Sequence, residues 1–410
     1  MMRLIFRWLR ENLFSTWYNT LLTVLSLWVL GMVLSGLWQW AVRDAVWSGG
    51  AAACHQARQL AQAEGRPWGA CWTVIPENLK LFLTGTYPPG ELWRIWVCVY
   101  LGVFLVGASA GVWRGLARDA AIALGSAVIL LLVLPFDWTE RLWIFGIVLA
   151  LFVPMGLAVI VRRRIPQVRW ILLGSWLAFP VLVVWLIGGG GVLPRVETTQ
   201  WGGLMLTFLL ACVGIVASFP LGVLLALGRQ SSLPVVRWLS ILYIEVVRGV
   251  PLITLIFMAS LMLPLFLPGN LRVDQALRAS VAFTLFTAAY IAENVRGGLQ
   301  AISRGQVEAA KALGLSHWLT TFFIVLPQAL RAVIPANVGQ FISLFKDTSL
   351  VFVAALLDLF NMGRSILANP QWLGSDREVL LFVAFVYWVF TYSMSLLSRR
   401  LEKLLGVGER

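Results

Sequence analysis

The chain has 410 residues, of which 60% are hydrophobic and only 12% are charged. Because an average globular domain has about twice that share of charged residues, and because disordered chains combine low hydrophobicity with high charge, this composition argues against both classes and indicates a polytopic helical membrane protein. The net charge of +13 fits basic loops kept on the cytoplasmic side of a membrane better than it fits a nucleic-acid partner.

Ten apolar segments are long enough to cross the roughly 30 Å hydrocarbon layer of a bilayer as helices. Two of them, residues 279–302 and 332–357, contain charged side chains within the span. The other eight are free of charge and cover residues 12–42, 95–113, 120–136, 142–161, 170–194, 198–228, 249–271 and 379–398. The prediction is an all-α integral membrane protein with about ten transmembrane helices, and this even number places both termini on one side.

The distribution of basic residues predicts which side that is. If the N-terminus is inside, the inner segments carry 19 Lys and Arg residues and the outer segments carry 11. The basic tract at residues 162–164 supports this orientation most strongly, and its ordinary role is to fix topology. Both termini are therefore predicted to be cytoplasmic.

The longest polar stretch, residues 43–91, follows the first span and is predicted to lie outside. It contains Cys54 and Cys71, and because that compartment permits disulfides, we expect the two to pair. Cys98 and Cys212 lie inside predicted spans, where they are expected to act as small apolar packing residues. With only two histidines in the chain, an ordinary zinc site is not expected.

The sequence lacks the motifs of catalysis. No span has a Ser, His and acid set with nucleophile spacing, and no HExxH occurs. None of the lysines follows a glycine, so a phosphate-binding loop of the G-x-x-x-x-G-K-[ST] type is missing as well. We therefore expect a non-catalytic chain that binds no cofactor of its own. Uphill transport would have to draw its energy from a partner or from an ion gradient.

Residues 301–331, on the predicted inner side, break the membrane pattern. Residues 306–313 favour a helix, and Gly314 can adopt the left-handed conformation that closes it. Ser316 can cap a second helix over residues 318–326, which Pro327 is expected to end. A helix–turn–helix of this kind suits docking into a groove on a soluble partner, whereas shape alone also fits a connecting loop that lies on the bilayer surface.

The same segment carries a recognisable motif. Its residues are Glu308, Ala309, Ala310, Gly314, Ile324, Leu326 and Pro327. Their spacing resembles the complete EAA signature of the permease subunits of binding-protein-dependent ABC importers. Residues 248–252, 288–298 and 346–350 resemble the polar amino-acid branch, with the histidine, glutamine and general L-amino-acid permeases, although Val250 departs from the small polar residue usual there. The resemblance covers about residues 200–400.

The resemblance implies a five-helix permease core of the type I, MetI-like ABC importer fold at residues 196–410, with a cytoplasmic EAA loop at residues 302–330. It also implies that this loop fits a cleft of an ATP-hydrolysing subunit, so that ATP and Mg bind to that partner. Two permease cores, two ATPase subunits and an external solute-binding protein would then import polar L-amino acids across a bacterial inner membrane.

Residues 1–195 look like an extension that the minimal permease lacks. They resemble the added N-terminal half of the larger subunit in general L-amino-acid transporters. Because that branch uses two different permease chains, the resemblance implies a heteromeric permease partner rather than a homodimer.

Charged residues inside the core are costly at membrane depth, so each needs a partner or a watery cavity. Glu245 and Arg248 are three residues apart on one helix face and are expected to pair, as are Glu293 and Arg296. Pro251 is expected to break the helix beyond Arg248, and broken helices are frequent at transporter sites. Arg248 and Glu293 therefore belong either to structural ion pairs or to the substrate path, where Arg248 would meet a substrate carboxylate.

A second polar cluster follows at Lys346, Asp347, Thr348 and Ser349. Lys346 and Asp347 are about 100° apart on a helix and are expected to find separate partners. Since an amino acid needs both an anionic and a cationic partner, we expect this cluster either to line the translocation path or to pack against a second permease chain. An ion-driven secondary transporter is the alternative; it would explain the buried charges but not the helix–turn–helix, and an intramembrane enzyme is disfavoured.

Overall fold

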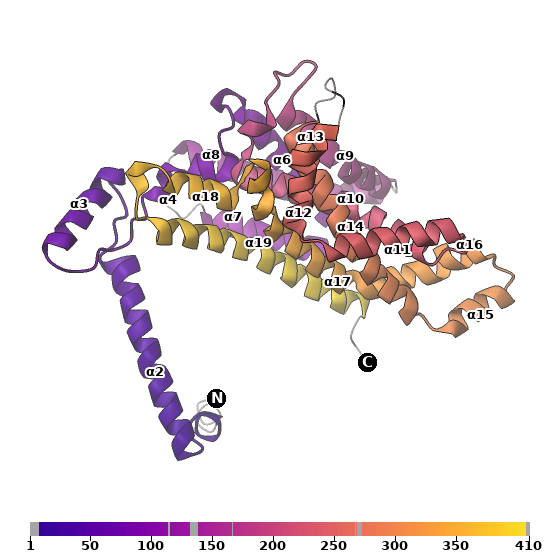
Figure 1. Ribbon diagram of the computed structural model, residues 1–410, viewed down its shortest axis with the longest axis horizontal. Coiled ribbons are helices and arrows are strands. Elements are labelled where there is room, and N and C mark those ends of the chain that lie inside the picture. Colours follow the sequence, from indigo (N-terminus) through magenta and orange to yellow (C-terminus); the bar gives the residue numbers. More distant parts are fainter. Residues whose placement is uncertain are drawn as a thin grey trace. The chain divides into compact units, whose positions relative to one another are not determined.

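The computed structural model describes residues 8–113, 115–131, 138–165, 167–266, 268 and 273–406, and helices dominate it (Figure 1). Five arginines that contribute to the predicted topology lie outside these residues: Arg3, Arg7, Arg114, Arg272 and Arg410.

The chain divides into two compact units. The first comprises Met1–Lys80 and Gly363–Ala384, and the second comprises Leu81–Met362 and Phe385–Arg410. The predicted division at residue 195 concerns the membrane topology of the two sequence halves, and it stays a prediction.

The first unit contains one long apolar helix and a short helical segment that a disulfide holds together. Thr16 caps the long helix by accepting a hydrogen bond from the Asn19 amide at 3.4 Å. No residue of this helix is buried, as suits a helix whose surroundings are lipid. The elements of the first unit are α2 (Trp17–Trp38), the π-helical turn Gln39–Arg43, α3 (Gly50–Ala63), α4 (Val74–Glu77), and parts of α5 (Leu79–Thr84), α18 (Leu359–Leu367) and α19 (Asp376–Leu405).

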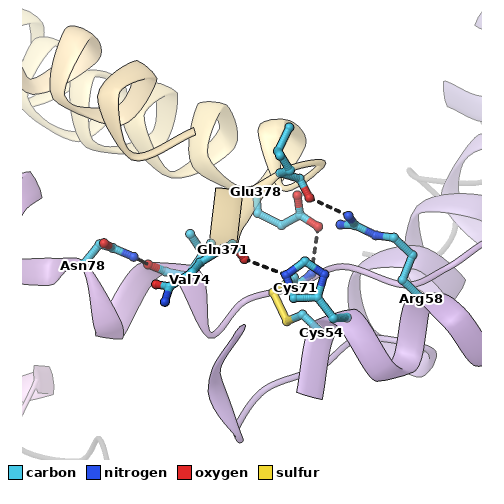
Figure 2. The surroundings of a disulfide bond; sticks show 9 residues. Cys54, Arg58, Cys71, Val74, Asn78, Gln371 and Glu378 are labelled. Atoms are coloured by element: carbon cyan, nitrogen blue, oxygen red, sulfur yellow. Dashed lines mark hydrogen bonds between the residues drawn. A yellow bond between two sulfur atoms is a disulfide. The ribbon is translucent and has the colours of Figure 1, made fainter. Parts of the chain in front are cut away.

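A disulfide joins Cys54 of α3 to Cys71, which precedes α4, so the pair expected from the sequence is bonded in the structure (Figure 2). The bonded segment lies against the residues that lead into α19. The Cys71 amide donates to the Glu378 carboxylate at 2.8 Å, and the Arg58 guanidinium donates to the Leu373 carbonyl (Figure 2). The predicted polar loop is thus a folded element with its own internal packing.

The second unit contains the remaining helices. In chain order these are α6 (Leu92–Val112), α7 (Leu116–Leu131), α8 (Trp138–Arg164), α9 (Val168–Gly188), α10 (Gly203–Arg229), α11 (Pro234–Gly249), α12 (Leu252–Phe257), α13 (Leu263–Phe266), α14 (Gln275–Ala301), α15 (Arg304–Ala312), α16 (His317–Leu319) and α17 (Leu326–Asp347), followed by the two-residue strand β1 (Leu357–Asp358).

Each of the ten predicted spans lies at least in part on helices of the described chain, and residues 267 and 269–271 of the predicted span 249–271 lie outside the described residues. Seven helical segments there are long and apolar enough to cross a membrane, and α11 with α12–α13 forms an eighth candidate that bends by 105°. The other two predicted spans fall on α14, which carries charges, and on α7, whose predicted extent continues into residues 132–136 outside the described chain. The all-α membrane fold is therefore confirmed.

The bend between α11 and α12 occurs where the sequence predicts a break. Val250 and Pro251 both have extended backbone angles between the two helices, with ψ of 136° and 140°. Proline disfavours a helical conformation at the preceding residue, which explains why α11 stops at Gly249.

The core of the second unit forms where α10 packs along α14. Both helices present small buried residues to each other, which lets their backbones approach closely. Gly222 of α10 illustrates this, because a Cβ atom there would lie 2.6 Å from the Ile291 side chain of α14. Replacement by any larger residue would push the two helices apart.

Gly85 and Tyr87, which precede α6, pack against the start of α10 and the end of α9. A Cβ atom on Gly85 would lie 2.5 Å from the Gly202 Cα atom, so the two backbones cross in contact. Gly202 in turn pairs with Leu357 in a parallel β-bridge. Tyr87 adds a hydrogen bond to the Ile187 carbonyl at 2.8 Å. Residues from both sequence halves therefore share one packed joint.

Candidate functional site

The EAA loop begins with helix α15, which ends in a left-handed turn. Gly314 has φ of +78°, as expected for the closing glycine. The Gly314 amide donates to the Lys311 carbonyl at 2.9 Å, and the Leu315 amide donates to the Ala310 carbonyl at 3.1 Å. These two bonds form a Schellman motif, which satisfies the carbonyl groups left free at the end of a helix.

The second half of the loop is a continuous helical rod rather than a separate helix. Ser316 caps it by accepting a hydrogen bond from the Leu319 amide at 3.4 Å, and α16 then runs through a π-helical turn, Thr320–Val325, into α17. The expectation that Pro327 ends this helix is wrong, because Pro327 lies in the first turn of α17. Proline is tolerated in the first turn, where the missing N–H removes no ordinary helical hydrogen bond.

The loop presents an apolar surface at the protruding end of the second unit (Figure 1). Glu308 and Ala309 are exposed, whereas Ala310 is buried against the rest of the loop. Leu313 is 81% exposed and Trp318 is 71% exposed. Trp318 lies at the start of the candidate membrane span His317–Ala354, so apolar side chains this open are covered either by lipid or by a partner protein.

A cluster of ion pairs connects α10, α11 and α14 at their ends near this loop. Glu293 of α14 is at its centre and contacts three guanidinium groups. Arg296 forms an ion pair with it on the same helix, Arg229 of α10 approaches to 3.5 Å, and Arg248 of α11 approaches to 3.8 Å. The predicted pair of Glu293 and Arg296 is thus confirmed as one part of a larger network.

The predicted pair of Glu245 and Arg248 is wrong. Glu245 forms its ion pair with Arg229 at 2.9 Å, and Arg248 turns instead toward Glu293 and stacks over the Tyr290 ring at 5.5 Å. The reason is tertiary: Arg229 reaches this point from the end of another helix, which the spacing along α11 does not reveal.

The second predicted cluster lies at the far end of α17 from the loop. Lys346 is exposed and Asp347 is half-buried, and Thr348 is buried with its hydroxyl donating to the Phe345 carbonyl at 2.8 Å. The Ser349 carbonyl accepts a hydrogen bond from the Asn361 side chain at 2.7 Å. Asn294, next to Glu293, donates to Asn337 of α17 at 3.1 Å. Lys346 lies nine residues further along that helix, about 14 Å away, so these residues and Glu293 form two separate groups.

A buried carboxylate beside this cluster went unnoticed in the sequence. Asp358 is fully buried and accepts hydrogen bonds from the Tyr387 hydroxyl at 2.8 Å and from the Asn361 amide at 3.1 Å. Burial raises the pKa of Asp358, and the hydrogen bonds from Tyr387 and Asn361 act to lower it. An isolated acid within the apolar run at residues 350–360 is the signal that would have identified it.

Within the described part of the chain, no group of three or more His, Cys, Asp or Glu residues is arranged to hold a metal ion. Ion pairs join the residues around Glu293, whereas Thr348 and Ser349 of the second cluster form hydrogen bonds with Phe345 and Asn361. Their arrangement is that of helix contacts and not of a nucleophile with its base.

Comparison with known proteins assigns the chain to a family. Residues 218–407 match the family described as binding-protein-dependent transport system inner membrane component. The inner membrane amino-acid ABC transporter permease protein YhdY of Escherichia coli is 40% identical over 403 residues, which cover 98% of this chain and 93% of that protein. This chain is an amino-acid ABC transporter permease by family.

Two further proteins resemble this permease. The glutamate/glutamine/aspartate/asparagine transport system permease protein BztC of Rhodobacter capsulatus is 39% identical, over 98% of this chain and 94% of that protein. A crystal structure described as an amino acid ABC transporter with histidines is 28% identical, with a TM-score of 0.45, over 49% of this chain and 91% of that chain.

The matches differ in how much of the N-terminal half of the chain they cover. The family match contains the EAA loop and both polar clusters but begins only within α10. Both long relatives align over 98% of this permease. The N-terminal half is therefore shared with natural relatives and is a regular part of a longer type of permease.

Proposed function

We propose that this permease is the membrane-spanning subunit of an importer in which a separate ATPase subunit grips the EAA loop. The observation that carries the proposal is the loop itself, a Schellman-closed helix followed by a capped helical rod with exposed Leu313 and Trp318. The residues assigned to this coupling are Glu308, Ala309, Ala310, Gly314, Ile324, Leu326 and Pro327.

The proposal includes the complete assembly. Two ATPase subunits with bound ATP and Mg would drive the cycle, a second and different permease chain would complete the pathway, and an external binding protein would deliver substrate. Polar L-amino acids, including glutamate, glutamine, aspartate and asparagine, are the proposed substrates, because the relative BztC is named for transport of these four. The permease would lie in a bacterial inner membrane with both termini cytoplasmic.

The proposed path uses the two polar groups at different depths. Arg248 and Glu293 would face substrate near the inner end, and Lys346, Asp347, Thr348 and Ser349 would do so near the outer end. The proposed domain division, which follows the topology predicted from the sequence, places a five-helix extension at residues 1–195 and the permease core at residues 196–410. An ion-driven secondary transporter is not favoured, since it leaves the exposed loop without a role.

The test replaces the glycine that closes α15. In Gly314→Ala, a side chain must adopt φ near +78°, and a left-handed backbone costs an L-residue about 1–2 kcal/mol. We expect normal membrane insertion but weaker binding of the ATPase, and a severalfold lower uptake of labelled glutamine by the whole transporter. The measurement pairs co-purification of the ATPase with uptake.

Gly305→Ala provides the matched control. Gly305 lies in the same helix, its φ is not positive, and a Cβ atom there meets nothing within 4 Å. This variant should transport normally. Equal uptake by both variants would reject the coupling role of the turn, and uptake by the permease alone in liposomes would reject the proposed ATPase.

A further inference from the structure

Within the first unit, an open groove of about 750 Å³ runs between α2 and the beginning of α19. One wall has Met32 of α2 at one end and Trp40 of the following π-helical turn, Gln39–Arg43, at the other, and the α19 wall includes Arg377 and Leu381. Its volume is within the range of about 300–1,000 Å³ that is usual for small-molecule sites. Because both walls belong to candidate membrane spans, the groove opens to lipid.

The disulfide-bonded segment fixes the two walls at one end of the groove. The Ala70 amide donates to the Trp40 carbonyl at 2.8 Å, and the next amide, that of Cys71, donates to Glu378 at 2.8 Å. Adjacent residues of the disulfide-bonded segment therefore connect the π-helical turn after α2 to the start of α19 (Figure 2 shows the bond to Glu378). The groove is thus held open by a covalently restrained element.

The lining is apolar apart from one arginine. Leu37, Leu380 and Leu381 are 50%, 43% and 49% exposed, and the Gly36 position is open because a Cβ atom there meets nothing within 4 Å. At membrane depth such a surface takes up hydrocarbon and not water. The occupant must therefore present an apolar chain along the groove.

Arg377 adds a requirement for negative charge. Its side chain is exposed, and in the described residues no hydrogen bond or ion pair engages its guanidinium. It lies in the first turn of α19, where a positive charge opposes the helix dipole and gains nothing from it. Guanidinium groups at the edge of a membrane bind phosphate oxygens, often through two parallel hydrogen bonds.

We propose that this groove binds a membrane phospholipid, with the lipid phosphate on Arg377 and one acyl chain along Gly36 and Leu381. The proposed topology places Trp40 and Arg377 at the outer surface, so the lipid belongs to the outer leaflet. This site goes beyond the import function, because it uses none of the residues assigned to coupling or to the substrate path.

The experiment titrates the delipidated, purified transporter complex with dioleoylphosphatidylglycerol and follows binding by native mass spectrometry. Dioleoylglycerol, which has the same chains without the phosphate, serves as the second probe. We expect Arg377→Gln to weaken binding of phosphatidylglycerol about tenfold, as loss of a hydrogen bond to a charged group does, and to leave dioleoylglycerol binding unchanged. Gly36→Leu should weaken binding of both, because its side chain fills the groove.

Two matched variants separate the site from general lipid contact. Gly31→Leu makes the same change on α2 at another open glycine outside the groove, and Arg364→Gln removes another exposed arginine of the first unit. Both should bind phosphatidylglycerol as the unmodified complex does. Equal affinity across all four variants would overturn the proposal.

A cross-linking measurement provides a second, independent refutation. If Gly36→Cys combined with Leu381→Cys forms an intrachain bond in native membranes in full yield, α2 and α19 close on each other and leave no space for lipid. If Gly36→Cys alone cross-links to the second permease chain, a protein helix occupies the groove. Either result would overturn lipid binding, whereas protection of these cysteines by added phosphatidylglycerol would support it.

Discussion

Glu293→Gln is the substitution expected to destabilise the permease core most at the end near the EAA loop. The change keeps the side-chain shape but removes the negative charge that three guanidinium groups contact. A partly exposed ion pair contributes about 0.2–1 kcal/mol, so three pairs with a carboxylate that is 23% exposed sum to about 2 kcal/mol. Without the Glu293 charge, the three arginines also repel one another, which lowers the free energy of unfolding further.

The assay is thermal unfolding of the purified complex, with Glu245→Gln as the matched control. Glu245 is 55% exposed and forms an ion pair with Arg229, so its loss should cost less than about 1 kcal/mol. Glu293→Gln should therefore unfold at a clearly lower temperature than Glu245→Gln. If both variants melt together with the unmodified complex, the network does not hold the three helices, and the reasoning from its geometry fails.

Three further results are expected. Asp358→Ala should destabilise the core by about 3 kcal/mol or more in chemical denaturation, because it leaves the Tyr387 hydroxyl and buried amides without their acceptor, whereas Asp358→Asn should cost less. Burial raises the pKa of Asp358 in the folded state, so the contribution of Asp358 to the free energy of unfolding is present at low pH and is lost as the pH rises through that raised pKa. The melting temperature of Asp358→Asn should therefore lack this decline with rising pH. Joint replacement of Cys54 and Cys71 by serine should remove about 3 kcal/mol from the stapled segment, as expected for a loop of this length, and limited proteolysis should then cut between residues 54 and 71 while the second unit stays intact.

Features that depend on neighbours in the chain could be predicted from the sequence. Gly314 takes the left-handed conformation because the helix before it needs a residue without a Cβ atom there. The break at Pro251 follows from the restriction that proline imposes on Val250. Cys54 and Cys71 share one predicted outer loop, which made their pairing foreseeable.

Features that depend on helix packing could not be predicted in the same way. Arg229 replaces Arg248 as the partner of Glu245 because α10 ends beside α11 and α14 in the folded core. The burial of Asp358 depends on Tyr387, which lies 29 residues further along the chain.

The prediction for Pro327 was wrong for a local reason, because the π-helical turn before it lets the helix continue into α17. A rule for proline inside a regular helix does not cover such a turn.

The positions of these networks suggest how a force on the EAA loop would reach the membrane. The loop begins directly after α14, and Glu293 lies eight residues before the end of that helix at Ala301, about 12 Å away. The arginines that pair with Glu293 are partly exposed, so these ion pairs can separate at modest cost. Asp358, in contrast, is fully buried at the opposite end and accepts hydrogen bonds from several donors. We therefore expect movement to begin at the ion cluster, which joins α14 to α10 and α11, while the hydrogen bonds of Asp358 with Asn361 of α18 and Tyr387 of α19 stay intact.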